Sequence, residues 1–307
     1  MDNSVILKAI SFFVMIAFGY LFKHFGLIKK EFGNELAVIS MKFFLPAAIM
    51  ASFATFQMDY SMLILILFGL GGGVIFLIIG YIITINGSRD DRIYYMVSGN
   101  SYNIGNFVLP FVSSFFGPVG IVSTSLFDAG NSVMLLGINC SVTEILVGNN
   151  GEKRHGKLAF ILKRLFSAPA FDAYVVMVTL ALLNIKLPSA FYSICSEIGK
   201  ANGPLAMFMI GAMLEIHFDK SYLNMTLKML LIRGLVSAFL MFIISRLTFL
   251  PDEARIAGMI IVWSPIGSAS AANTAILGGN TAIGAFVNTM SLLCSLIIMP
   301  TLVLLLH

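Results

Sequence analysis

The sequence has few charged residues and few polar stretches. Of its 307 residues, 11% are charged and 58% are hydrophobic, whereas a soluble domain carries roughly 25% charge. This shortage of charge, together with long apolar runs along the whole chain, excludes a soluble protein. It predicts an all-α, polytopic protein in the lipid bilayer. No basic stripe with interleaved aromatic residues occurs, which excludes nucleic acid as a partner.

Residues typical of catalysis or metal binding are also scarce. No histidine lies deep in an apolar segment, so neither a membrane serine–histidine pair nor an HExxH metal site can be assembled. The three cysteines lie in or near apolar segments and are interpreted as packing residues. No G-x-x-x-x-G-K-[ST] motif for ATP is present. We therefore expect neither an enzyme nor a metal or cofactor, apart from a coupling proton or sodium ion.

Ten membrane spans are predicted when about 20 residues are allowed per helix. They cover residues 4–23, 34–56, 61–85, 93–115, 119–147, 158–184, 190–216, 222–249, 254–276 and 281–306. The longest clearly polar link lies at the middle of the chain. We therefore expect a first five-helix unit over 1–148, a loop over 149–157 and a second five-helix unit over 158–307.

Basic residues are distributed unevenly between the links. The links after spans one, three, five and seven contain Lys23, Lys29, Lys30, Arg89, Arg92, Lys153, Arg154, Lys157 and Lys220. The opposite links contain only Lys186, Lys200, Arg246 and Arg255. Because basic residues gather on the cytoplasmic side, we expect the odd-numbered links in the cytoplasm and both termini outside the cell membrane.

The two halves can be overlaid at an offset of about 155–160 positions. The matched pairs are Pro46 with Pro204, Asp59 with Asp219, and Pro110 with Pro265. Because each half has an odd number of spans, the second half enters the membrane from the opposite side. The sequence thus predicts an inverted repeat with a pseudo-two-fold axis in the membrane plane.

Span four combines amides with a proline. Asn100, Asn103 and Asn106 recur every three residues, which predicts a stripe on one helix face. Pro110 lacks a backbone donor and disfavours helix at Leu109, so we expect a break lined by amides. We interpret Asn103, Asn106 and Pro110 as a candidate substrate site. The alternative is that the asparagines only join helices.

Span nine carries a second predicted break. Pro265 follows a long apolar half, and small and polar residues come after it. We expect this segment to cross the broken span four and to complete the substrate site. Its candidate residues are Ser264, Pro265, Ser268 and Asn273. The alternative is a tightly packed interface of small residues.

Span five contains a carboxylate deep in an apolar segment. Asp128 is followed one helical turn later by Asn131, and a charge at the bilayer centre costs at least about 2.5–3.5 kcal/mol. We predict that Asp128, Asn131 and Asn100 bind the coupling proton or cation. A structural hydrogen bond to a broken helix is the alternative for Asp128. The roles of Lys42, Asp172 and Arg233 stay open.

Several short motifs resemble those of the auxin efflux carrier family, which includes plant PIN carriers and bacterial dicarboxylate permeases. They are the spacing from Asn103 to Pro110, the segment LFDAGN in span five, GPLAMFMIGAML in span seven, and Ser291, Ser295 and Pro300 in the last span. The resemblance covers nearly the whole chain. The chain departs from the family at Gly278-Gly279-Asn280, where many relatives carry a charged stretch, and it lacks the long central loop of the plant carriers.

The resemblance implies a bacterial-type member with a fold like that of sodium/proton antiporters and bile-acid symporters. Spans 1, 2, 6 and 7 would form a scaffold, through which the family often dimerises. Spans 3–5 and 8–10 would form a mobile elevator unit with spans four and nine crossing. The implied substrate is a small organic anion such as malate, malonate, oxalate or an indole acid. A channel or a ligand sensor that keeps the carrier fold is the alternative.

Overall fold

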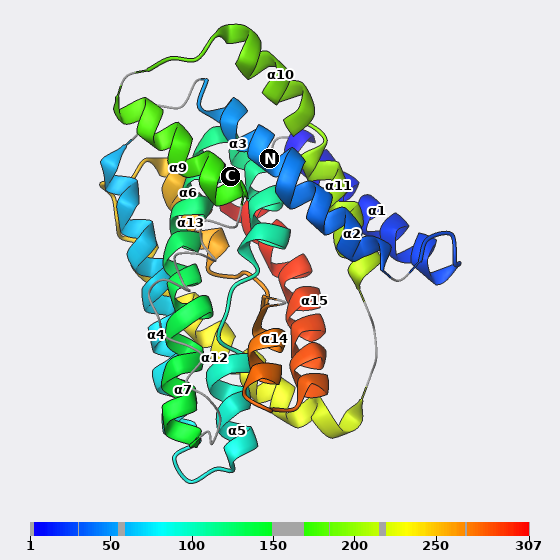
Figure 1. The fold of residues 1–307 in the computed structure, drawn as a ribbon, viewed down its shortest axis with the longest axis vertical. Coiled ribbons are helices and arrows are strands. Elements are labelled where there is room, and N and C mark those ends of the chain that lie inside the picture. Colours follow the sequence, from blue (N-terminus) through cyan, green and yellow to red (C-terminus); the bar gives the residue numbers. More distant parts are fainter. Residues whose placement is uncertain are drawn as a thin grey trace.

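The computed structural model describes residues 3–29, 31–54, 59–148, 169–183, 185–214, 219–267 and 269–306. This part of the chain contains helices and no strand (Figure 1). The α-helices are α1 (Asn3–His24), α2 (Phe32–Ile39), α3 (Leu45–Ser52), α4 (Ile64–Ile83), α5 (Arg89–Ile93), α6 (Leu109–Val133), α7 (Asn139–Val147), α9 (Pro169–Leu182), α10 (Ser189–Gly199), α11 (Asn202–Met213), α12 (Lys220–Ser245), α13 (Asp252–Ile261), α14 (Ala269–Ile276) and α15 (Thr281–Leu306). Five-residue π-helical turns cover Ser40–Phe44, Tyr94–Ser98, Ile104–Val108 and Met134–Ile138, and a 3-10 turn covers Tyr60–Leu63.

Six helical segments of the described residues are long and apolar enough to cross a membrane. They are Ile6–His24, Phe32–Ser52, Tyr60–Ile83, Ile104–Val133, Lys220–Ser245 and Thr281–Leu306. The chain is therefore a multi-pass helical membrane protein. The first part of predicted span six, residues 158–168, and the central loop over 149–157 lie outside the described residues.

Predicted span four is interrupted, but upstream of the proline. Helix α5 and the π-helical turn after it end at Ser98, and residues 99–103 are not helical. Leu109 has helical dihedral angles (φ −63°, ψ −49°), so the predicted break at this residue is wrong. The N–H of Leu109 donates to the carbonyl of Ile104, five residues back. We infer that this wider turn accommodates the Pro110 ring.

The boundary between predicted spans four and five lies inside the segment assigned to α6. Gly117 has φ +50° and ψ −132°, which is not helical, and Pro118 follows it. Because L side chains rarely adopt a positive φ of this kind, glycine is required for the change of direction. Predicted span seven is also divided, because a turn at Lys200 and Ala201 separates α10 from α11.

Two pairs of helices pack closely through glycines. A Cβ built on Gly19 of α1 would overlap the carbonyl of Phe208 in α11, and one built on Gly211 would overlap the carbonyl of Ile16. Gly69 of α4 and Gly130 of α6 make the same kind of approach. Small residues permit such backbone contacts where no hydrophobic effect drives helices together. Figure 1 shows α1, α2 and α11 grouped apart from α5, α7, α12 and α14.

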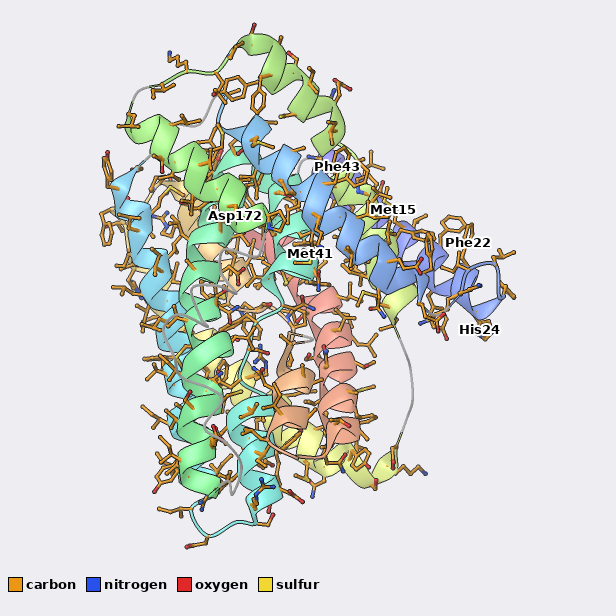
Figure 2. All side chains as sticks on the ribbon, viewed as in Figure 1. Met15, Phe22, His24, Met41, Phe43 and Asp172 are labelled. Carbon is orange, nitrogen blue, oxygen red and sulfur yellow. The ribbon has the colours of Figure 1, made fainter. Side chains whose placement is uncertain are left out.

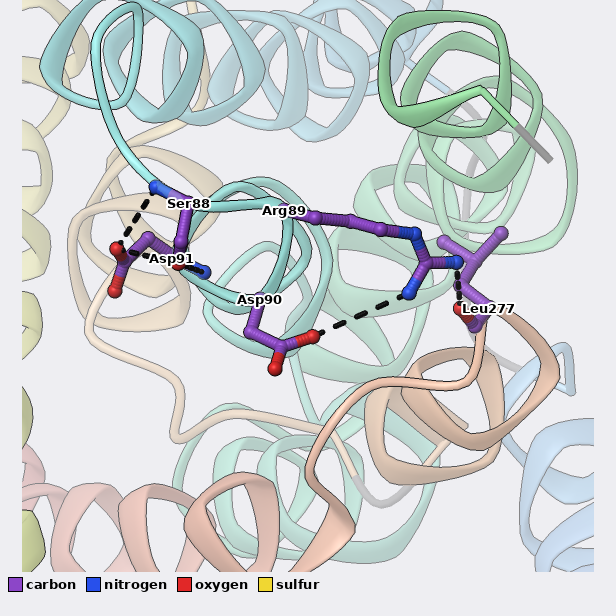
Figure 3. A network of polar contacts seen from close by, with 5 residues as sticks. All are labelled: Ser88, Arg89, Asp90, Asp91 and Leu277. Carbon is purple, nitrogen blue, oxygen red and sulfur yellow. Dashed lines mark hydrogen bonds and ion pairs between the residues drawn. The ribbon is translucent and has the colours of Figure 1, made fainter.

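Arginines cap helix C-termini at the end of the molecule where α5 lies (Figures 1 and 3). Arg89 donates to the carbonyl of Leu277, just beyond α14, at 2.7 Å, and lies 4.0 Å from Asp90. Arg92 donates to the carbonyl of Leu146 in α7 at 3.0 Å. Ser88 and Asp91 form a capping box at the start of α5. The contacts of Arg89 and Arg92 place positive charge at the negative ends of helix dipoles.

Candidate functional site

The two interrupted spans meet at their non-helical segments. We name residues 99–103 the first break and residues 262–267 the second break. The backbone N–H of Asn103 donates to the carbonyl of Pro265 at 2.8 Å, and the N–H of Gly267 donates to Ser101 Oγ at 3.0 Å. Non-helical backbone of this kind is tolerated in a membrane only where protein or a water-filled cavity surrounds it.

Asparagine side chains satisfy the backbone of the first break. Asn131 of α6 accepts from the N–H of Tyr102 at 3.2 Å and donates to the carbonyl of the same residue at 3.3 Å. Asn139 of α7 donates to the carbonyl of Asn100 at 2.8 Å, and Asn100 Nδ2 donates to Asn139 Oδ1 at 3.1 Å. Asn100 Nδ2 also donates to the carbonyl of Gly73 at 3.0 Å. The side-chain amides thus bind backbone groups of Tyr102 and Asn100 that would be paired within a continuous helix.

Serine hydroxyls satisfy the backbone of the second break. Ser237 of α12 donates to the carbonyl of Val262 at 2.6 Å, and Ser295 of α15 donates to that of Trp263 at 2.8 Å. Ser291 accepts from the N–H of Ile266 at 2.9 Å. Ser291 and Ser295 are spaced one helical turn apart, so they face the break from one side of α15.

Arg233 of α12 joins the two breaks. Its Nη1 donates to the carbonyls of Gly99 and Ser101 at 2.6 and 3.0 Å, and its Nη2 donates to that of Ser264 at 2.9 Å. The guanidinium carbon also lies 4.9 Å from the centroid of the Phe76 ring and 5.3 Å from that of Tyr102. The residue is 5% exposed. Among the described residues, no carboxylate forms an ion pair with it.

The three asparagines of span four do not share one face. The chain is non-helical between Asn100 and Asn103, so the predicted single stripe is wrong. Asn100 Nδ2 donates to Gly73 and Asn139, while its Oδ1 is buried without a partner among the described residues. The side chain of Asn103 makes no hydrogen bond to the described residues, and Asn106 Oδ1 is buried without such a partner. The two amides nearest the start of the second half-helix therefore have free hydrogen-bonding capacity.

Met41, from the second predicted span, approaches the glycine that lies between these two asparagines in the sequence. A Cβ built on Gly105, between Asn103 and Asn106, would lie 3.4 Å from Met41 Cε. Figure 2 shows Met41 on the segment that joins α2 to α3. The helical turn that follows the first break therefore faces the α2–α3 segment at Gly105.

Asp128 is connected to the first break through the side chain of Asn131. Asn131 Nδ2 donates to Asp128 Oδ1 at 2.9 Å as well as to the carbonyl of Tyr102. A carboxylate, one amide and the backbone of Tyr102 thus form one connected network. A change in the charge of Asp128 would act on the break through Asn131.

The other predicted site residues are used within the protein. Pro110 is buried and its carbonyl accepts from the hydroxyls of Ser113 and Ser114. The hydroxyl of Ser264 donates to the neighbouring carbonyl of Pro265 at 3.1 Å. Asn273 Nδ2 donates to the carbonyl of Leu135 at 2.7 Å. Ser268 lies outside the described residues.

Lys42 and Asp172 lie away from the hydrogen bonds of the crossing. Lys42 is exposed. Asp172 lies on α9, and its Oδ1 is buried without a partner among the described residues (Figure 2). His24 lies at the outer end of α1, and the described residues contain no cluster of metal-binding side chains.

A pocket of about 240 Å³ lies between α5, α12, α14 and α15. Asp90 and Asp91 line it, together with Ser98 and Thr274. The hydroxyls of Ser98 and Thr274 are 2.7 Å apart and link the two broken spans beside the first break. The pocket thus extends from α5 to the residue that precedes the first break.

One family model matches nearly the full length of the chain. The model of the family described as "Membrane transport protein" matches residues 4–306. A search of the curated proteins finds no match.

Proposed function

The chain belongs to this family of membrane transport proteins, and we propose that it is a secondary active transporter of a small organic anion. The family match confirms the resemblance to the auxin efflux carriers. The proposed substrates are dicarboxylates such as malate, malonate or oxalate, or an auxin-like indole acid.

The free amides of Asn103 and Asn106 carry this proposal. The side chains of Asn103 and Asn106 make no hydrogen bond to the described residues, whereas Asn100 has only its Oδ1 unpartnered. They lie where a half-helix begins, and the first N–H groups of a helix have no partner within it. Such N-termini favour anions. Arg233 holds the adjoining carbonyls of Gly99 and Ser101 and so fixes the backbone that precedes this half-helix. We propose that Asn103 and Asn106 bind the carboxylate, with Ser264, Pro265, Ser268, Asn273 and Pro110 shaping the site.

Asp128 is the proposed coupling group. Uptake of an anion against a negative-inside potential requires a co-transported cation, and Asp128 supplies a carboxylate next to the break. Asn131 would transmit its charge state, because the same amide nitrogen bonds Asp128 and the carbonyl of Tyr102. Asn100 supports the break through Asn139.

An elevator movement is proposed for the crossing and its supporting helices. The scaffold would contain α1, α2, α3, α9, α10 and α11, and the mobile unit would contain α4–α7 and α12–α15. Gly105, between the two free amides in the sequence, faces Met41 of the proposed scaffold, so such a movement would change the interface beside them. A homodimer through the scaffold is also proposed.

An inverted ten-span topology accompanies this proposal. Asp59 and Asp219, matched in the two halves, each accept from the N–H two residues later at 2.8 Å, at the start of a helical segment. In Figure 1 the arginine-bearing α5 lies at the opposite end of the view from α10, and both termini lie in the upper half. We propose that the α5 end is cytoplasmic and that both termini are outside.

Solid-supported-membrane electrometry on proteoliposomes tests the function. Malate, malonate, oxalate, succinate, pyruvate and indole-3-acetate would be applied with and without sodium and a pH step. We expect a saturable response to one acid, with counterflow of labelled acid as the readout if exchange is electroneutral. An unsaturable flux would indicate a channel. No flux of any acid, with binding detected by thermal unfolding, would indicate a sensor.

Variants of the free amides test the site. Asn103→Ala should raise the half-saturating concentration about tenfold, because a hydrogen bond to a charged group contributes about 1.5 kcal/mol or more. Asn106→Ala should act in the same direction. Asn86→Ala makes the same chemical change in an exposed turn and should leave the affinity unchanged. Wild-type affinity in both site variants would remove these residues from the site.

The coupling role is tested by Asp128→Asn. This variant should keep the fold, because an amide can still accept from Asn131, but it should lose concentrative transport. Asp252→Asn is the matched control, since Asp252 is an exposed carboxylate at the start of α13. Transport by Asp128→Asn with wild-type pH and sodium dependence would contradict the coupling role.

A further inference from the structure

The carbonyls bound by Arg233 come from the C-terminal ends of two half-helices. Gly99 and Ser101 follow the half-helix that ends at Ser98, and Ser264 follows α13, which ends at Ile261. The C-terminus of a helix carries a partial negative charge and carbonyls without helical partners. Two such ends converge at the crossing, so this point strongly favours a cation.

Carriers with broken helices place a coupling cation among carbonyls of this kind. In this chain the position is filled by a side chain. We propose that Arg233 is a resident cation that takes the place of a coupling sodium ion at the crossing, so that the protein folds around the crossing and binds its anion without sodium. The part about anion binding rests on the proposed function, whereas the role of Arg233 in holding the crossing does not.

The surroundings of Arg233 suit a permanent charge. A guanidinium has five N–H donors in a fixed plane, and three different carbonyls accept from it. The rings of Phe76 and Tyr102 add cation–π attraction. Gly72 leaves room for this arrangement, because a Cβ built there would overlap the Tyr102 hydroxyl. Three carbonyl dipoles and two ring faces thus compensate the charge without a carboxylate.

Arg233 also ties together segments that are far apart in the sequence. One guanidinium holds carbonyls of both the first and second breaks. A sodium ion in this position would have to bind and leave during each cycle, whereas Arg233 stays attached to α12. The proposed mobile unit would therefore keep its crossing intact in both orientations, and the coupling step would be left to Asp128.

Thermal unfolding of the purified full-length protein tests the inference without any substrate. Unfolding temperatures would be compared in sodium chloride and choline chloride at equal ionic strength. The wild type should give the same temperature in both salts. Arg233→Ala and Arg233→Gln should unfold at lower temperature in choline, and sodium should raise that temperature in a saturable way. Arg233→Lys keeps a cation and should show no sodium response.

Arg246→Ala is the matched control. Arg246 follows the C-terminus of the same helix, is exposed, and lies 5.0 Å from the ring of Phe242. Its removal changes the net charge equally, so it should produce no sodium response. A sodium response in this variant equal to that of Arg233→Ala would overturn the inference, because it would show a general effect of charge.

Two further outcomes would overturn the inference. One is a wild type that sodium stabilises specifically or whose anion counterflow requires sodium. The other is an Arg233→Ala variant with wild-type stability and no sodium response. If neither neutral variant can be purified, the wild type and Arg233→Lys decide: sodium independence of both supports the inference. If no acid of the panel is transported, the proposed function fails, while the unfolding comparison still tests the role of Arg233.

Discussion

The two breaks expose similar backbone groups but are stabilised by different chemistry. In the first break, Asn131 binds both the N–H and the carbonyl of Tyr102, so one side chain fixes one residue at two points. In the second break, Ser237, Ser291 and Ser295 each bind a different residue at a single point. An amide has separate donor and acceptor ends, whereas a hydroxyl is a single rotating group. We infer that the first break is the more rigidly held of the two.

Asn131 should give the largest effect if this comparison is right. Asn131→Leu would leave the N–H and the carbonyl of Tyr102 without partners, and each such buried group costs about 1–3 kcal/mol. The variant should show a markedly lower unfolding temperature and little transport. Asn224→Leu is the control, because Asn224 is exposed on α12. An Asn131→Leu variant as stable as this control would contradict the two-point role of the amide.

Single serine variants of the second break should have smaller effects. Ser291→Ala leaves one N–H and Ser295→Ala leaves one carbonyl without its partner, which corresponds to about 1 kcal/mol each. Both proteins should fold and transport, with modest reductions in unfolding temperature. The double variant should lose more than either single variant, and its departure from the sum measures how far the two contacts to the same break are coupled. A single serine variant that is destabilised more than Asn131→Leu would reverse the ranking of the two breaks.

Sequence analysis could identify the interrupted spans but not how they are held. Pro265 lies within the second break, whereas Pro110 lies in helix downstream of the first, because a wide turn accommodates its ring. The asparagine stripe assumed a regular helix, and the non-helical segment between Asn100 and Asn103 separates residues that a helix would align. The predicted break at Leu109 and the predicted asparagine stripe both assumed a helix with 3.6 residues per turn, and both are wrong because the backbone departs from that period.

Long-range contacts were beyond what local patterns indicate. The sequence leaves the role of Arg233 open, because its carbonyl partners lie as far as 134 positions away. Ser291 and Ser295 enter the sequence analysis only as part of a motif that resembles the family's, and this motif does not indicate which backbone groups they bind. Patterns of this kind reveal polar residues in a membrane span, and only the packed structure shows whether protein or substrate uses them.

The smallest expected effect concerns the paired caps, Asp59 and Asp219. The N–H of Ser61, which donates to Asp59, holds the pKa of Asp59 below its ordinary value, and the hydroxyl and N–H of Ser221 do the same for Asp219. A carboxylate with a lowered pKa stabilises the folded state above the unfolded pKa of about 3.9. That contribution is lost as the pH falls through the lower, folded value.

Asp59→Ala and Asp219→Ala should therefore lower the unfolding temperature slightly and equally near neutral pH. The difference from wild type should shrink in acid, because protonation removes the same contribution from the native protein. Asp90→Ala, an exposed carboxylate whose Arg89 contact is 4.0 Å long, serves as a control for loss of surface charge. Because Asp59 and Asp219 occupy matched places in the two halves, unequal effects would show that the halves differ in how their helices begin. Equal effects would show that the two matched caps contribute equally to stability, in contrast to the two breaks, which are stabilised by different side chains.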